Sequence, residues 1–307
     1  MSAQYSHVNS PKPQSNGRST PYRPAPPAAG MNTRSLDCAA MTIPFRRRRA
    51  RVRPSPVFLA IVAVAAAGGY LCWTASAADT VTGTTRSARF GVFLFIVAGW
   101  LVTICLHEFA HAYLAHRFGD DEVEARGYLT LNPIKYSHPV LSILLPVVFI
   151  AMGGIGLPGG AVYLHPHRFR TDLQRALVSL SGPLTNVAFA VILIGLAKNA
   201  GFPNTHGVFW AAVAGLGLLQ VMAAILNLLP IPGLDGYGAL EPYLDPNFRR
   251  NAEQVKPFGM LIVFVLLQLQ QINQVFFDFI YWLFDLSGLS HQFGQYGIEL
   301  LKFWQQT

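Results

Sequence analysis

The stretch H-E-F-A-H, from His107 to His111, is the part of the sequence that decides how the rest is interpreted. It lies near the end of an apolar run, residues 90–115, in which Glu108 is the only charged residue. Histidine and glutamate side chains are costly inside lipid, so a membrane segment that carries them must satisfy them with a metal, a cavity or each other. The placement therefore predicts a buried polar site within a membrane helix.

The spacing of the motif favours a metal. Residues four apart share one face of a helix, so His107 and His111 can present two ring nitrogens to one ion. Glu108 is rotated by about 100° from His107, which makes it a poor third ligand and a good general base for a water at the metal. We therefore predict a zinc-dependent hydrolase. The alternative is a pair of packing histidines beside a glutamate that stands there by chance.

A candidate third ligand follows a later apolar run, in N-L-L-P-I-P-G-L-D-G at residues 227–236. Asp235 would complete a set of two histidines and one carboxylate and leave a fourth position for water. Pro230 and Pro232 lack backbone donors, so they stop the helix where the carboxylate has to turn inward. The stretch taken alone also fits an ordinary loop at the end of a membrane helix.

Three motifs in this order resemble those of the site-2 protease family of intramembrane zinc metalloproteases. They are H-E-x-x-H at residues 107–111, G-P-x-x-N at residues 182–186, and N-x-x-P-x-P-x-x-D-G at residues 227–236. The resemblance covers residues 90–243, about half of the chain, and includes G-Y-L-T-L-N-P at residues 127–133.

The resemblance implies roles for six residues and one Zn²⁺ per chain. The implied zinc ligands are His107, His111 and Asp235, the implied general base is Glu108, and the implied polar groups near the zinc are Asn186 and Asn227. An amide in a membrane helix serves helix packing equally well, so the two asparagine roles rest on the resemblance alone.

The implied activity is that of a metalloendopeptidase that cleaves transmembrane segments of membrane-anchored proteins. By resemblance, typical substrates are single-span transcriptional regulators or remnants of signal peptides. The alternative is a non-enzymatic membrane zinc-binding protein or transporter. Glu108 separates the two, because a metal carrier has no need of a base beside its ligands.

The charge is concentrated in residues 1–54, which hold ten Lys or Arg residues and one acidic residue, Asp37. The remainder has 13 basic and 14 acidic residues, so the basic character does not indicate a nucleic-acid partner. The composition of residues 1–54 predicts a disordered tail. The arginines at positions 46–53 are expected to hold this end in the cytosol, with binding of nucleic acid or anionic lipid as the alternative.

The composition, 52% hydrophobic and 12% charged, fits a membrane protein whose partner is the lipid bilayer. Residues 55–80 are predicted to form an N-terminal transmembrane anchor around the apolar run 57–76. The run ends in A-S-A at residues 75–77, so a cleaved signal-like segment is the alternative. Cys38, Cys72 and Cys105 form no disulfide or metal-binding pattern.

Residues 88–245 are predicted to form the protease core, with the site near the cytosolic side of a bacterial plasma membrane. If residues 140–156 crossed the membrane, Asp235 would emerge on the wrong side, so this run is expected to be a re-entrant hairpin. By resemblance, residues 126–131 are expected to form a small β element on the cytosolic side that presents an edge to the substrate, with a plain interfacial loop as the alternative. His165 and His167 are expected to be solvated in a basic loop and not to bind metal.

The remaining apolar runs complete the predicted fold. Residues 176–198 and 207–229 are expected to span the membrane out and back, and residues 257–276 to form a further span. Residues 275–286 fit either an interfacial helix or a short span, within a C-terminal region of membrane or interfacial helices, residues 246–307. The sequence therefore predicts an all-α polytopic membrane protein with about five to six transmembrane helices, a re-entrant hairpin and a small β element.

Overall fold

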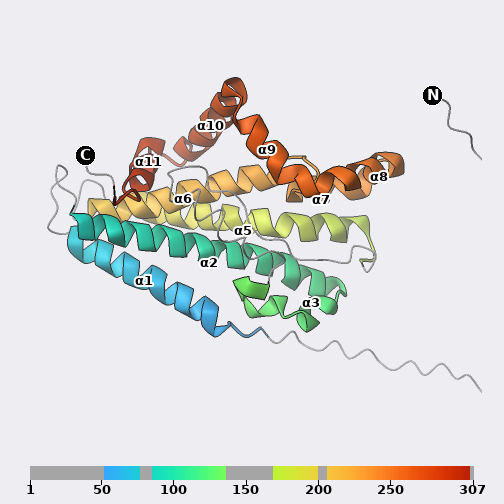
Figure 1. The fold of residues 1–307 in the computed structure, drawn as a ribbon, viewed down its shortest axis with the longest axis horizontal. Helices are drawn as coiled ribbons and strands as arrows, with labels where there is room; N and C mark the ends of the chain where they lie inside the picture. Colours follow the sequence, from blue (N-terminus) through green and yellow to red (C-terminus); the bar gives the residue numbers. More distant parts are fainter. Residues whose placement is uncertain (1–51, 77–84, 136–168, 200–205, 305–307) are drawn as a thin grey trace, which may run out of the picture. The chain divides into compact units, whose positions relative to one another are not determined.

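The computed structural model describes residues 52–76, 85–135, 169–199 and 206–304, all within the unit formed by residues 49–307 (Figure 1). Every regular element in these ranges is helical, and they contain no strand. Four helices are long and apolar enough to cross a membrane: α1 (Pro56–Ser76), α2 (Arg86–Phe118), α5 (Asp172–Asn199) and α6 (Gly207–Leu228). The prediction of an all-α membrane protein is confirmed at this level.

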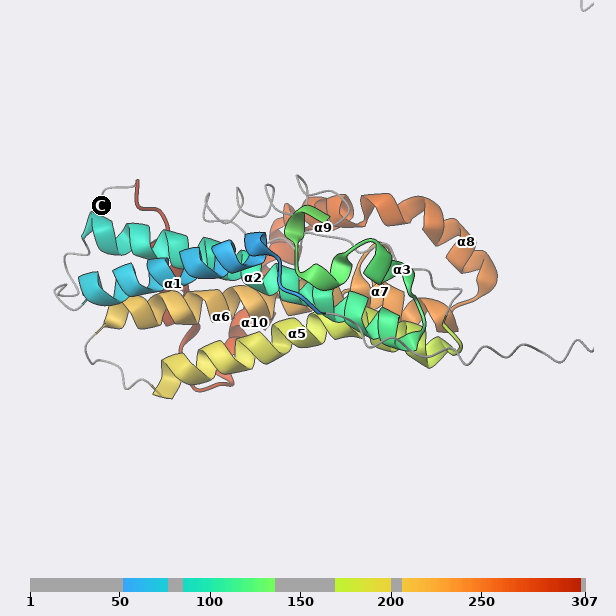
Figure 2. The same ribbon diagram turned by 90° about the horizontal axis from the view of Figure 1, so that it is seen from below.

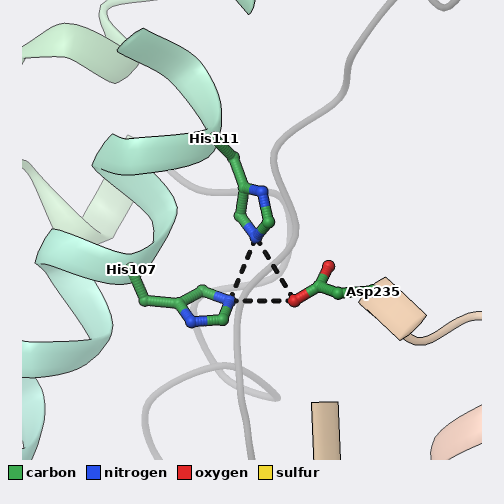
Figure 3. Close-up of side chains that lie close together, drawn as sticks. All are labelled: His107, His111 and Asp235. Carbon is green, nitrogen blue, oxygen red and sulfur yellow. Dashed lines mark hydrogen bonds and ion pairs between the residues drawn. The ribbon is translucent and has the colours of Figure 1, made fainter. Parts of the chain in front are cut away.

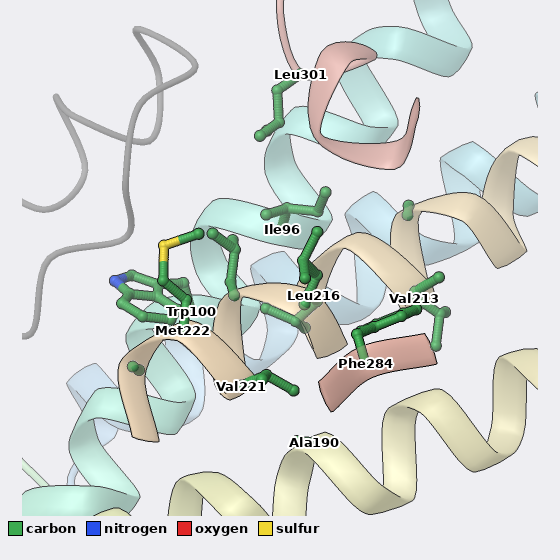
Figure 4. Close-up of a cluster of buried hydrophobic side chains, with 14 of the residues drawn as sticks. Ile96, Trp100, Ala190, Val213, Leu216, Val221, Met222, Phe284 and Leu301 are labelled. Atoms are coloured by element: carbon green, nitrogen blue, oxygen red, sulfur yellow. The ribbon is translucent and has the colours of Figure 1, made fainter. Parts of the chain in front are cut away.

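Helix α6 is the central element of the packing. In the most apolar part of its candidate span, 83% of the residues are buried. Apolar side chains surround the helix on nearly every face, as expected for a helix enclosed by others. It contacts α1, α2 and α5, and also α10 (Gln270–Asp285) and α11 (His291–Glu299) (Figure 2). The core between these helices contains Trp100, Leu216 and Phe284, which are shown in Figure 4. Burial of this apolar surface keeps the long helices together.

Helix α2 begins and ends at residues suited to helix termini. The hydroxyl oxygen of Thr85 accepts a hydrogen bond from the backbone N–H of Ala88 at 3.2 Å, and Gly119 closes the last turn at φ 115°. Helix α1 packs closely against α2 at Gly68. A Cβ added at this position would lie only 2.6 Å from the backbone nitrogen of Phe95. Small residues permit this approach between membrane helices.

The predicted β element at residues 126–131 is wrong. Tyr128–Thr130 form a 3₁₀ turn (η1), in which the backbone N–H of Thr130 bonds the carbonyl of Gly127 at 3.1 Å. The residues on both sides, Gly127 at φ 76° and Leu131 at φ 54°, have left-handed backbone conformations. A left-handed residue at each end is incompatible with an extended strand. Tyr128 and Leu129, whose side chains would suit a strand, are instead buried as part of this turn.

Residues 257–276, which were predicted to form a further span, belong to a pair of helices with a sharp bend between them. The chain forms α8 (Pro246–Val255), a 3₁₀ turn η6 (Lys256–Phe258), α9 (Gly259–Leu267) and then α10, and it bends by 96° between Leu267 and Gln270. The side-chain amide of Asn273 donates to the carbonyl oxygen of Leu267 at 3.0 Å. This carbonyl would otherwise lack a backbone donor, because the helix ends there. Residues 275–286, which fitted two interpretations, largely belong to α10.

The bent pair of helices runs from one end of α5 to the other. Near its start, the segment before α8 packs on α5 where Gly238 approaches Ser179, and after its end the ammonium of Lys198 donates to the carbonyl of Ser287 at 2.6 Å. Ser179 and Lys198 are about 28 Å apart along α5, close to the thickness of a hydrocarbon core. The described residues therefore hold four candidate spans, or five if this bent pair forms one broken span.

Several predictions fall on residues outside the described ranges. These are the tail at residues 1–51, the re-entrant hairpin at residues 140–156, and the histidines at positions 165 and 167. Cys72 and Cys105 are both buried among apolar residues, in agreement with a packing role.

Candidate metal centre

Three side chains from distant parts of the chain converge on one point (Figure 3). The Nε2 atoms of His107 and His111 are 3.1 Å apart, and they lie 3.2 and 3.3 Å from Oδ2 of Asp235. Both histidines are buried, and the carboxylate of Asp235 is partly buried. The structure thus brings together the three residues that the motifs pointed to as ligands.

The local structure explains how Asp235 reaches the two histidines. His107 and His111 lie on one face of α2, and Asp235 is the first residue of a short helix, α7 (Asp235–Leu240). Helix α6 stops at Leu228, after which the backbone becomes extended and passes through the two prolines. A Cβ at Gly236 would collide with the carbonyl oxygen of Leu228, so the turn from α6 into α7 depends on a residue without a side chain.

The other ring nitrogen of each histidine is held by an oxygen. Nδ1 of His111 lies 2.7 Å from the carbonyl oxygen of Val178, and Nδ1 of His107 lies 3.1 Å from Oδ1 of Asn186. A carbonyl oxygen only accepts, so these contacts require the proton of each neutral imidazole on Nδ1. The lone pair of each ring is then on Nε2, on the side that faces Asp235.

This arrangement fits a bound zinc ion. Two Nε2 lone pairs and a carboxylate oxygen face one another at short range, and Oδ2 of Asp235 is buried without a hydrogen-bond partner. Electron pairs at such distances repel unless a cation lies between them. Bonds of about 2.0 Å to a tetrahedral ion separate the ligand atoms by about 3.3 Å, which matches the observed spacings.

Helix α5 leaves room for the site at Gly182. A Cβ at this position would lie 2.5 Å from Nε2 of His107 and would also collide with Nε2 of His111. Pro183 follows directly within the same helix, and Asn186 is one turn further on. The G-P-x-x-N motif therefore contributes both the space and the hydrogen bond to His107.

The remaining predicted residues are close in sequence to this centre. Glu108 is 3% exposed, next to His107 in α2, and Asn227 is buried in the last turn of α6. Sequence reasoning missed the carbonyl of Val178 and the hydroxyl of Ser181, which donates to that carbonyl at 2.6 Å. The role of the Val178 carbonyl could not be predicted, because every residue has a backbone carbonyl. Gly182, by contrast, is the first residue of the G-P-x-x-N motif.

Three relatives show what this chain is similar to. It is 54% identical over 260 residues to the "Putative zinc metalloprotease Rip2" of Mycolicibacterium smegmatis, an alignment that covers 85% of this chain and 98% of the relative. It is 51% identical over 257 residues to the protein of the same name from Mycobacterium tuberculosis, covering 84% and 96%. It is 32% identical over 181 residues to the "Putative zinc metalloprotease YwhC" of Bacillus subtilis, covering 56% and 79%. No protein-family model matches the chain, and no solved structure matches it significantly.

The relatives and the helical fold identify a membrane zinc metalloprotease as the class of this protein. The chain belongs to the site-2 protease family, as its three motifs indicated, and its closely matching relatives carry the name Rip2. Zinc is the metal that the names of these relatives imply, and the triad of His107, His111 and Asp235 is suited to it.

Proposed function

We propose that this protein is an intramembrane zinc metalloendopeptidase that cleaves a peptide bond in or next to a transmembrane segment of another protein. The observation that carries the proposal is the position of the triad: two of its members lie within a membrane-spanning helix, and both are buried. A site at this position favours a membrane-embedded segment, which reaches it from within the bilayer, over a soluble substrate.

Two kinds of group share the proposed chemistry. Zinc bound by His107, His111 and Asp235 would supply polarisation of the scissile carbonyl and a lowered pKa for water. Glu108 takes the proton from the attacking water and passes it to the leaving amine. Its burial keeps the carboxylate in an environment of low dielectric, where proton transfer to and from a positioned group is effective.

Other residues orient the ligands. Asn186 holds His107, and the carbonyl of Val178 holds His111, so each imidazole keeps one tautomer and one ring orientation. Asn227 is proposed as a further polar group near the zinc, as the family resemblance implies. The substrate helix has to unwind before cleavage, because helical hydrogen bonds shield its carbonyls.

The site is proposed to lie near the cytosolic face of the plasma membrane. His111 and His107 are seven and eleven residues before the last residue of α2, Phe118, which is about 10 and 17 Å from its end. The arginine cluster at positions 46–53 favours a cytosolic N-terminus. With that end inside, α1 runs outward and α2 returns toward the cytosol.

Replacement of Asp235 by alanine is expected to remove the metal. The two histidines remain, but two neutral ligands without the carboxylate hold zinc much more weakly, so zinc content of the purified protein and cleavage should both fall at least tenfold. Elemental analysis measures the zinc. The matched control is Asp121→Ala, since the carboxylate of Asp121 is 58% exposed and lies outside the site. Full zinc content in Asp235→Ala would remove Asp235 from the ligand set.

A second expectation concerns residues 140–156. Phe169 packs in one cluster with Tyr128 and Leu129, so the chain before and after residues 136–168 lies at the same end of the helices. This packing supports the proposal that residues 140–156 form a re-entrant hairpin and do not cross the membrane. Single cysteines at Ser137 and Thr171, in a cysteine-free background, should resist an impermeant thiol reagent added to intact cells and react after permeabilisation. Labelling of position 171 from outside would contradict the proposed topology.

A further inference from the structure

The segment between α8 and α9 lies directly against the loop that leads to Asp235. A Cβ at Gly259 would collide with the carbonyl oxygen of Pro232, and a Cβ at Gly233 would collide with that of Lys256. Gly233 also has φ 99°, a backbone conformation that other residues rarely adopt. Backbone therefore packs on backbone here, with no side chains between the two segments.

Lys256 adds a polar connection at the same place. Its ammonium donates to Oε1 of Glu241 and to Oε1 of Glu253, at 2.7 Å in each case. Lys256 and Glu241 are partly buried, at 27% and 23% exposed, whereas Glu253 is 62% exposed.

The two carboxylates differ in what they connect. Glu241 directly follows α7, six residues after Asp235, so its bond to Lys256 joins the α7 segment to η6. Glu253 is three residues before Lys256 in α8, so its bond stays within one segment. The ammonium also lies 5.7 Å from the ring centroid of Tyr237, a buried residue of α7. Lys256 thus bonds the residue that follows the ligand-bearing helix α7 and also lies near an aromatic ring within that helix.

We propose that Lys256 and Glu241 act as positioning residues for the metal centre: their ion pair holds α7 against η6 so that the carboxylate of Asp235 faces the two histidines. This inference rests on the proposed function of the triad. Of the three ligands, Asp235 alone is not carried by a long helix. It follows a loop that contains two prolines and a left-handed glycine, so contacts from outside that loop determine where its carboxylate lies.

The test compares two substitutions with the same chemistry. Glu241→Gln removes the charge that joins the two segments, and Glu253→Gln removes a charge bonded to the same ammonium at the same distance. The measurement is the apparent zinc Kd of purified full-length protein, by competition with a chelator. Glu241→Gln and Lys256→Met should weaken zinc binding about tenfold, the range typical of groups that orient metal ligands. Glu253→Gln should change the zinc Kd less than about twofold. Lys256→Arg, which keeps the positive charge, should have nearly the same zinc affinity as the unaltered protein.

Hydrogen exchange of the zinc-free protein gives a second, metal-independent readout. Residues 233–241 should exchange faster in Glu241→Gln than in Glu253→Gln, since only the first substitution releases α7. Equal zinc affinity and equal exchange in the two variants would overturn the positioning role while leaving the triad intact. Absence of zinc binding by the unaltered protein would instead overturn the proposed function, and with it this inference.

Discussion

Glu108→Gln should abolish cleavage while leaving zinc bound. Glutamine has nearly the same shape as glutamate, so the buried site should keep its packing, but an amide cannot accept the proton of the attacking water. General base catalysis contributes about 10²–10⁴-fold, so the rate should fall by about 10³-fold or more. The comparison is made on a membrane-anchored substrate in reconstituted vesicles, with zinc measured in the same preparation.

The zinc measurement separates this variant from ligand variants. His107→Ala and His111→Ala should lose both zinc and cleavage, whereas Glu108→Gln should lose cleavage alone. A Glu108→Gln protein that still cleaves would disprove the role of Glu108 as base. An unaltered protein that binds zinc and cleaves nothing in a survey of membrane-anchored proteins would favour the non-enzymatic alternative.

Gly182→Ala should also have a large effect, through the space that it fills. The added methyl group would lie 2.5 Å from Nε2 of His107 and collide with Nε2 of His111, where the ligand atoms converge. Either the imidazoles move or α5 moves away from α2, and both changes separate the ligands. Zinc affinity should fall at least tenfold, and activity should fall with it.

Gly195→Ala is the matched control for this substitution. It lies in the same helix, and a Cβ there would meet nothing within 4 Å. Alanine favours helix by about 1 kcal/mol over glycine, so this variant should keep its zinc and its activity and melt no lower than the unaltered protein. Equal zinc affinity in the two variants would show that Gly182 is not needed to make room for the metal.

The candidate site could largely be predicted from the sequence because its logic is local. The four-residue spacing of His107 and His111 places both on one face of any helix, whatever surrounds it. Pro230 and Pro232 end a helix for reasons internal to the backbone, so the position of Asp235 after a helix end was also readable. Asp235 was proposed as the partner of the two histidines because zinc needs a third ligand, and the resemblance to a family supported that pairing across more than a hundred residues.

The β element was misjudged because tertiary contacts there override local preference. Residues 126–131 contain good β-forming residues, yet the left-handed conformations of Gly127 and Leu131 and the burial of Tyr128 produce a 3₁₀ turn. The run at residues 257–276 was expected to form a further span, and the structure adds a break after Leu267 that its hydropathy did not indicate. Hydropathy measures how well a segment dissolves in lipid and contains no information on its bends.

The sequence by itself determined the helical membrane class, the ends of the principal helices and the chemical identity of the metal-binding groups. These follow from hydrophobic length, from proline and glycine positions, and from side-chain chemistry, which are properties of short segments. Only the tertiary structure showed what surrounds the ligands: the carbonyl of Val178 at His111, the space at Gly182, and the ion pair of Lys256 with Glu241 that follows α7. Such contacts join residues far apart in the chain, and they exist only once the helices have packed.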